Sequence, residues 1–147
     1  MSTVQFTYET YIRSTAEKAW KALFDPTMTE KYWQHENRSD WKKGSKWYHI
    51  RSEKPGTIDI VGAVVQYSKP KRLVLSWAFP EDENKTRKHS RVIIDIKPYR
   101  GAVLVRVTHD KLEKGSEMLG GITDGWPKVM SSLKTLLETG KPLPKLW

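Results

Sequence analysis

Residues 119–137 read LGGITDGWPKVMSSLKTLL, and this stretch decides the fold. Its apolar residues recur at the three- and four-residue intervals of an amphipathic helix. They are Leu119, Ile122, Trp126, Val129, Met130, Leu133, Leu136 and Leu137. Gly140, with two prolines close behind it, predicts where the helix ends. Because a proline inside a helix removes a backbone donor, we expect a kink or a break near Pro127.

The residues before this helix predict a sheet. Apolar and polar residues alternate, or form short apolar runs, over 46–51, 58–67, 73–79, 91–97 and 103–109. Short turns such as Lys54-Pro55-Gly56-Thr57 separate these segments, so neighbouring strands are expected to pair antiparallel. One face of the sheet is more apolar throughout, and the helix over 119–137 is expected to cover it.

The N-terminal part of the chain predicts one more strand and two short helices. Residues 6–12 are rich in aromatic and β-branched side chains, as strands are. Ser14-Thr15-Ala16-Glu17 reads as a capping box with Ser14 as the N-cap. Asp25-Pro26 predicts the start of a second helix over 27–33, and the polar stretch up to Ser45 is expected to be a loop. The predicted fold class is α+β, in the order β-α-α-β-β-β-β-β-α.

Composition limits the function classes. The chain has 147 residues, of which 37% are hydrophobic, and this predicts a single domain over 1–147 with a real core. It has no cysteine, which excludes disulfides, thiolate metal sites and cysteine nucleophiles. The N-terminus lacks a signal-peptide pattern, and no apolar run approaches the ~20 residues of a spanning helix, so a cytoplasmic protein is expected.

Several stretches together resemble one superfamily. They are residues 19–26 (AWKALFDP), Tyr32-Trp33, residues 40–45 (DWKKGS), residues 71–77 (KRLVLSW), Thr108-His109-Asp110 and the segment from Gly125 to Gly140. In this order they are similar to START-like (SRPBCC, helix-grip) domains, and to the AHSA-type branch related to the activator of the ninety-kilodalton heat-shock ATPase. The resemblance implies a curved sheet of six or seven strands wrapped round the C-terminal helix, with a cavity between them. It implies no shared catalytic residue, and Pro127 departs from the family pattern.

Seven tryptophans are the strongest anomaly of the composition. They can simply fill the core, or they can line an apolar pocket between the sheet and the helix. Gly121 and Gly125 share a helix face and would leave volume there, although they could equally allow close approach to the sheet. The expected ligand-binding residues are Trp33, Trp47, Trp77, Phe79, Ile94, Val105, His109, Ile122, Trp126 and Met130.

His109 is the one candidate for polar chemistry in this pocket. It ends an inward-facing series of valines, where it could bond a ligand or act as a general base, or be satisfied by the protein itself. Asp110 follows directly and should point the other way. The other histidines lack ligand spacing, so we expect no metal, no cofactor and no catalytic residue.

The net charge of +9 permits contact with nucleic acid or a membrane surface. However, acidic residues are interleaved with the basic ones over 81–106, which is typical of a solvated sheet face, and neither partner is expected. The leading hypothesis is a non-enzymatic domain that binds a small apolar or aromatic ligand. The alternatives are a chaperone-accessory interaction module, with a link to the stress response, and a cyclase- or hydratase-type enzyme. A monomer or a weak homodimer is expected, with the Leu146-Trp147 tail docked on its own domain or on a second copy.

Overall fold

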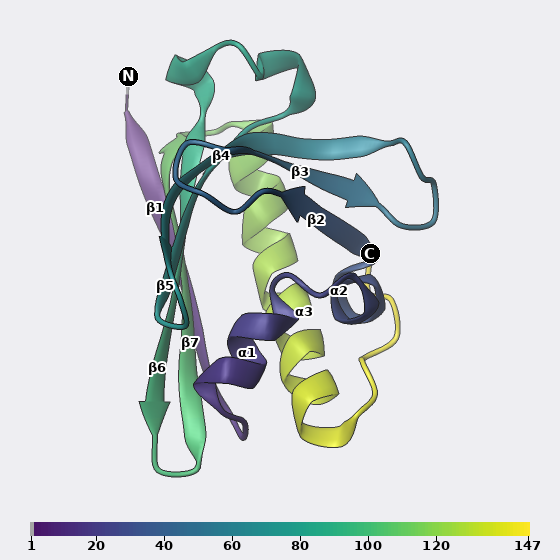
Figure 1. Ribbon diagram of the computed structural model, residues 1–147. Helices are drawn as coiled ribbons and strands as arrows, with labels where there is room; N and C mark the ends of the chain where they lie inside the picture. Colours follow the sequence, from purple (N-terminus) through teal and green to yellow (C-terminus); the bar gives the residue numbers. More distant parts are fainter. Residues whose placement is uncertain (1) are drawn as a thin grey trace.

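The computed structural model describes residues 2–147. The elements, in chain order, are β1 (Thr3–Ile12), α1 (Ala16–Ala22), α2 (Pro26–Trp33), β2 (His35–Ser39), β3 (Lys46–Arg51), β4 (Ile58–Ser68), β5 (Arg72–Trp77), the short 3₁₀ helices η1 (Pro80–Asp82) and η2 (Thr86–Lys88), β6 (Ser90–Tyr99), β7 (Ala102–Glu113) and α3 (Glu117–Thr139). The strands form one antiparallel sheet in the order β1-β7-β6-β5-β4-β3-β2. The sheet curves around α3, as Figure 1 shows, which confirms the α+β helix-grip fold.

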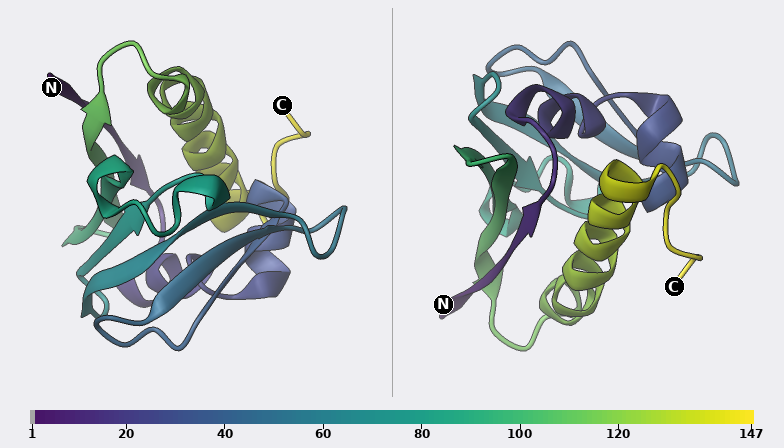
Figure 2. Two further views of the ribbon diagram at one scale, coloured as in Figure 1. Left: turned by 90° about the horizontal axis from the view of Figure 1, so that it is seen from above. Right: turned by 90° about the horizontal axis from the view of Figure 1, so that it is seen from below.

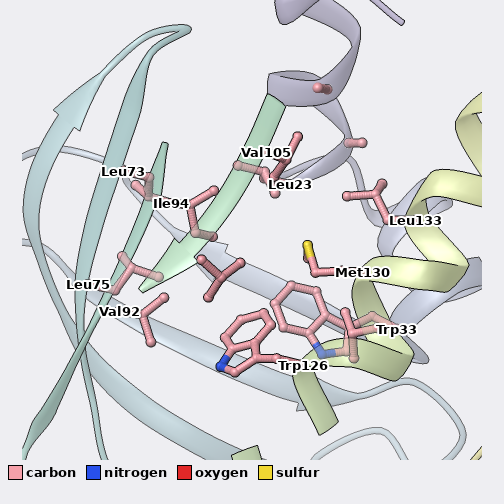
Figure 3. Close-up of a cluster of buried hydrophobic side chains, with 14 of the residues drawn as sticks. Leu23, Trp33, Leu73, Leu75, Val92, Ile94, Val105, Trp126, Met130 and Leu133 are labelled. Carbon is pink, nitrogen blue, oxygen red and sulfur yellow. The ribbon is translucent and has the colours of Figure 1, made fainter. Parts of the chain in front are cut away.

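The helix α3 buries the predicted stripe against the hollow of the sheet. Trp126, Met130 and Leu133 point from α3 toward residues of β5, β6 and β7 (Figure 3). Gly140 ends the helix in the left-handed conformation, with φ of 86°, as predicted. Of the kink or break expected near Pro127, the break is absent, because the helix runs from Glu117 to Thr139. Burial of Trp126, Val129 and Met130 around it outweighs the about 3 kcal/mol that an internal proline costs.

The first helix begins one residue later than the capping-box pattern predicts. The hydroxyl of Thr15, not that of Ser14, accepts the N–H of Lys18 at 3.2 Å, so Thr15 is the N-cap. The second helix begins as predicted, because the Asp25 carboxylate accepts the N–H of Thr27 and Pro26 occupies the first turn. The views in Figure 2 show both short helices beside the C-terminal end of α3.

The stretch before Ser45 was expected to be a loop, and this is wrong for residues 35–39. They form β2, which pairs antiparallel with β3 and is an edge strand of the sheet. Its sequence, HENRS, is polar because only Asn37 is buried, so no alternation of apolar residues marks it as a strand. The sheet therefore has seven strands, one more than the pattern along the chain predicts.

Strands β4 and β5 approach each other closely at Gly62. The indole N–H of Trp47 donates to the carbonyl oxygen of Ser76 at 2.8 Å directly beside this glycine. A Cβ atom at position 62 would lie 1.9 Å from that same oxygen. Glycine is therefore needed here for space, and it lets Trp47 lie flat in the sheet–helix interior.

The chain beyond α3 returns along its own domain. The N–H of Leu143 donates to the Ser132 hydroxyl at 3.1 Å, and Lys145 pairs with Glu53 at 2.9 Å. Leu146 and Trp147 at its end remain 42% and 43% exposed.

Candidate functional site

The buried aromatic cluster between the sheet and α3 contains most of the predicted site residues. Trp126 lies 5.5 Å from both Trp33 and Trp77, measured between ring centroids, and Trp77 lies 5.2 Å from Trp47. These rings come from α2, β3, β5 and α3, so residues far apart in sequence meet at one place. Figure 3 shows Trp33 and Trp126 side by side, with Met130 next to them on α3.

His109 lies inside this cluster, fully buried, and both its ring nitrogens are used. The Ser90 hydroxyl donates to the carbonyl oxygen of Trp77 at 2.9 Å, so its oxygen accepts the Nε2–H of His109 at 2.8 Å. The Nδ1 atom of His109 accepts the indole N–H of Trp126 at 3.1 Å. This chain of donors fixes one neutral tautomer of the ring.

The pKa of His109 reflects this environment. Burial lowers it to about 4, against a small opposing effect of Asp110, so the ring is neutral near pH 7. Asp110 points to the other face of the sheet, as predicted, and forms a bidentate pair with Arg91. His109 thus has no nitrogen available for a substrate. The geometry supports the interpretation that hydrogen bonds within the protein satisfy this histidine.

A second polar group lies at the β2–β3 side of the cluster. The Nδ2 group of Asn37 donates to the carbonyl oxygen of Leu23, so its Oδ1 accepts the Nδ1–H of His49 at 2.6 Å. His35 stacks on His49, with ring centroids 3.9 Å apart and planes 5° from parallel. Burial, and then the charge of His35, hold the pKa of His49 well below its usual value.

His35 connects this group to the surface. Its two ring nitrogens lie 2.8 Å from the carbonyl oxygen of Trp33 and 2.8 Å from the Asp59 carboxylate. Arg51 also donates two hydrogen bonds to Asp59. Burial raises the pKa of Asp59, but the hydrogen bonds from Arg51 and His35 outweigh this and lower it overall. These contacts lead from the buried ring of His49 to a half-buried ion pair of Arg51 and Asp59.

The structure does not contain the open cavity that was expected between the sheet and α3. The void at the centre of the aromatic cluster measures about 10 Å³, which is at most the room of one water molecule. Of the predicted residues, those lining it are Trp33, Trp47, Trp77, Ile94 and Trp126. Val105, His109, Ile122 and Met130 are buried in the core nearby. Phe79 lies apart, at the start of η1, where it lines a pocket that opens to solvent.

The glycines of α3 do not leave volume under the helix. Gly121 is exposed and Gly125 half-buried, and a Cβ atom built on either would meet no atom within 4 Å. They lie on the side of α3 away from the sheet. Neither role considered for these glycines, added volume in the interior or close approach to the sheet, is found, because the helical phase that buries Ile122 and Trp126 turns the glycines away from the packed face.

Two costly features lie around the small void. The indole N–H of Trp77 is buried without a hydrogen-bond partner in residues 2–147. Trp41, which lines the same void, has φ of 56°, a left-handed conformation that is unfavourable for a bulky side chain. Trp41 also lines two pockets on the outer surface, so this residue lies between the interior void and those pockets.

Four residues of the site were not predicted from the sequence. Asn37 was missed because β2 was taken for a loop. His49 follows Trp47 by two residues on a predicted strand, and this spacing does place both on one face. No pattern in the sequence pairs Ser90 with His109 or puts Trp41 over the void, since both depend on how strands distant in sequence meet.

One known protein family matches most of the sequence. The sequence pattern of one family, described as "Activator of Hsp90 ATPase homolog 1-like protein", matches residues 13–138. Among curated proteins, none matches the sequence significantly. Within residues 2–147, no helix combines the length and apolar character that a membrane span requires.

Three solved structures illustrate the similarity. The Aha1 dimer of Colwellia psychrerythraea has a TM-score of 0.76 at 21% identity, over 94% of this chain and 98% of that one. A protein of Mesorhizobium loti gives 0.76 at 21%, over 91% and 96%. CalU16 of Micromonospora echinospora gives 0.73 at 18%, over 95% and 77%. At these identities the similarity supports a shared fold and nothing finer.

Proposed function

Because the chain belongs to the family of Activator of Hsp90 ATPase homolog 1-like proteins, we propose that it acts as one helix-grip domain that binds a small apolar or aromatic ligand. The proposed site is the aromatic cluster of Trp33, Trp47, Trp77 and Trp126. The small void at its centre belongs to a closed state, and the ligand enters by displacing Trp41.

One observation carries this proposal: the indole N–H of Trp77 is buried without a partner in the described chain, and the residue that carries it lines the void. A buried donor without an acceptor costs about 1–3 kcal/mol. The left-handed backbone at Trp41, another residue that lines the void, costs a similar amount. An aromatic ligand with a carbonyl or other acceptor group would recover the first cost.

The proposed activity is binding without catalysis. His109 is neutral and has both ring nitrogens occupied, and His49 has its Nδ1–H bound to Asn37. His109 therefore supplies no available general base for a cyclase or hydratase reaction, and any such reaction would have to use the unprotonated Nε2 of His49, which is fully buried in the core.

The test uses thermal unfolding and nuclear magnetic resonance with bicyclic aromatic aldehydes, such as naphthaldehydes, as probes. A binding probe raises the melting temperature and shifts the indole proton of Trp77. The variant Trp77→Phe keeps an aromatic ring but lacks the N–H, and we expect it to bind about 10-fold more weakly. The variant Trp147→Phe, at the exposed end of the chain, is the matched control and keeps wild-type affinity. If no probe moves the Trp77 signal, the proposal is wrong.

The second candidate function is an accessory module for a heat-shock ATPase, which would place the chain in the cytoplasm. The family description and the net charge of +9 favour it. A purified Hsp90-type ATPase should then retain the chain at low ionic strength and release it as salt rises, because the contact would be electrostatic. Failure to retain it at low salt removes this candidate.

A further inference from the structure

We propose that the outer surface carries a docking groove for an acidic peptide segment with one apolar anchor residue. This groove, called the outer groove below, has two adjoining parts. The sheet part is a hollow of about 650 Å³ on β4, β5 and β6, and the helix part is a hollow of about 570 Å³ beside α1. Both parts are lined by Trp41 and Tyr67, so they adjoin at these two side chains. The inference is independent of the ligand site in the core.

The sheet part is basic. Its cations are Lys42, Lys43, Arg72 and Arg91, and no carboxylate lines it. Arg72 and Arg91 pair with Asp95 and Asp110 on neighbouring strands. Lys42 and Lys43 are exposed and have no carboxylate within 4.0 Å in the part of the chain that is described. Two cations side by side without counter-charges favour a partner with negative charge.

The floor and the far end of the outer groove are apolar. Val65, Val74 and Ile93 form the floor of the sheet part, and Val65 is 43% exposed. At the other end, Phe24 lies 4.6 Å from Trp41 and 5.7 Å from Tyr67, measured between ring centroids. This end can hold one apolar side chain against aromatic rings while acidic neighbours lie along the lysines.

The helix part carries charges of both signs. Lys18 and Lys69 line it and have no ion pair within residues 2–147, whereas Lys21 pairs with Asp25. Glu17 also lines this part, so the basic character of the outer groove comes mainly from the sheet part.

The geometry favours a peptide over a nucleic acid. Trp41 meets Phe24 edge to face, with planes 72° apart, and Trp20 meets Tyr67 at 71°. Rings packed in this way already cover one another's faces, whereas single-stranded nucleic acids need open faces on which bases stack. The aliphatic floor likewise offers nothing to a phosphate backbone.

The test is fluorescence anisotropy with a labelled peptide of alternating glutamate and aspartate around a central leucine. Wild-type protein is expected to bind it, with affinity falling as ionic strength rises. The double variant Lys42→Glu/Lys43→Glu should bind at least about 10-fold more weakly. The matched control Lys31→Glu/Lys54→Glu makes the same change of net charge at exposed positions outside the groove, and it should lose less than about 2-fold.

Four outcomes would overturn the proposal. Equal loss in both double variants means that the peptide senses only net charge. Equal binding of a peptide with serine in place of leucine means that no apolar anchor is used, and tighter binding of a single-stranded oligonucleotide means a different partner. Analytical sedimentation tests whether the protein associates with itself through the outer groove. If it does, and the Lys42→Glu/Lys43→Glu variant does not, the groove binds a second copy of this chain and not a peptide. None of these results bears on the naphthaldehyde experiment.

Discussion

Individual buried polar residues fix the orientation of their neighbours in this core through hydrogen bonds. Ser90 links the carbonyl oxygen of Trp77 to His109, and His109 accepts from Trp126, so one hydrogen-bonded chain joins β5, β6, β7 and α3. Each member is buried, and each removal would leave a partner unpaired. The arrangement fixes the orientation of two tryptophan rings that apolar packing alone would leave less defined.

Replacement of Ser90 tests this chain of bonds. Ser90→Ala should lower the free energy of unfolding by about 1–3 kcal/mol, because the N–H of His109 and the carbonyl oxygen of Trp77 both lose a buried partner. Urea unfolding measures the change. Ser131→Ala, a half-buried serine of α3 whose hydroxyl has no bond within residues 2–147, should change stability by less than about 0.5 kcal/mol. Equal costs for the two variants would contradict the interpretation.

The lowered pKa of His109 predicts a pH dependence of stability. Between the ordinary value of 6.5 and the folded value of about 4, the unfolded chain takes up a proton that the folded chain does not. The contribution of neutral His109 to the free energy of unfolding is therefore fully present above pH 6.5, and it falls as the pH decreases toward 4. At pH 5 the loss is about 2 kcal/mol. His49 acts in the same direction.

Urea unfolding at pH 7.5 and pH 5.0 measures this effect. The variant His109→Gln cannot be protonated, so it should lose less stability than the wild type between these two pH values, by about 2 kcal/mol. A wild type and a variant with the same pH dependence would show that His109 is not the group responsible.

At the scale of single elements, α3 shows which part of a helix its sequence determines. The stripe from Ile122 to Leu136 and the stop at Gly140 were read correctly, because period and cap are local properties. The break considered at Pro127 does not occur, because the continuation of a helix through a proline depends on how the residues around it pack. In the same way β2 was not predicted, since a polar edge strand is defined by its partner β3 and not by its own residues.

Replacing glycine by alanine is expected to have opposite effects on stability in α3 and in β4. Gly121→Ala and Gly125→Ala should each raise the free energy of unfolding by about 1 kcal/mol, because the added methyl meets no atom and improves helix propensity. Gly62→Ala should instead destabilise strongly, since its Cβ would lie 1.9 Å from the Ser76 oxygen. Thermal unfolding measures all three. A loss of stability in the α3 variants would mean that these glycines are needed for space after all.

At the scale of the whole molecule, α3 is held unevenly. Its C-terminal end is clasped to the end of β1: Lys134 donates to the carbonyl oxygen of Tyr11 at 2.6 Å, and the N–H of Arg13 donates to the Glu138 carboxylate at 2.8 Å. The hydrogen bond from the Arg13 N–H, and after it the hydrogen bond from Lys134, lowers the pKa of Glu138. The turns before Trp126 contain three glycines, and within the described residues none of their side chains hydrogen-bonds to the sheet, whereas Trp126 itself donates to His109.

Hydrogen exchange should follow this difference. We expect the amides over 122–125 to exchange faster than those over 133–137, because opening of the N-terminal half breaks fewer contacts than global unfolding does. Glu138→Ala should speed exchange over 133–137 and leave the sheet unchanged. Uniform protection along α3 would show that the helix opens only when the whole domain unfolds.

Part of the topology could be predicted from the sequence, but the interior could not. The antiparallel pairing of strands that follow one another and the covering helix follow from alternation and short turns, which are visible residue by residue. The pairing of β1 with β7 does not, because these strands lie far apart in the chain. Whether Trp33, Trp77 and Trp126 enclose space depends on how far their rings interpenetrate, and this is set jointly by four elements. The sequence therefore placed most of these side chains in one core, yet it suggested a hollow where the structure has a packed cluster.

The contact of four indole rings also has an optical consequence. Trp47, Trp77, Trp126 and Trp33 follow one another at 5.2–5.5 Å in a fixed, chiral order. At such spacing the chromophores share excitation, so they absorb and emit as one coupled array. Near-ultraviolet circular dichroism will therefore report the geometry of the entire array, and a rotation of any one ring changes the spectrum of all four.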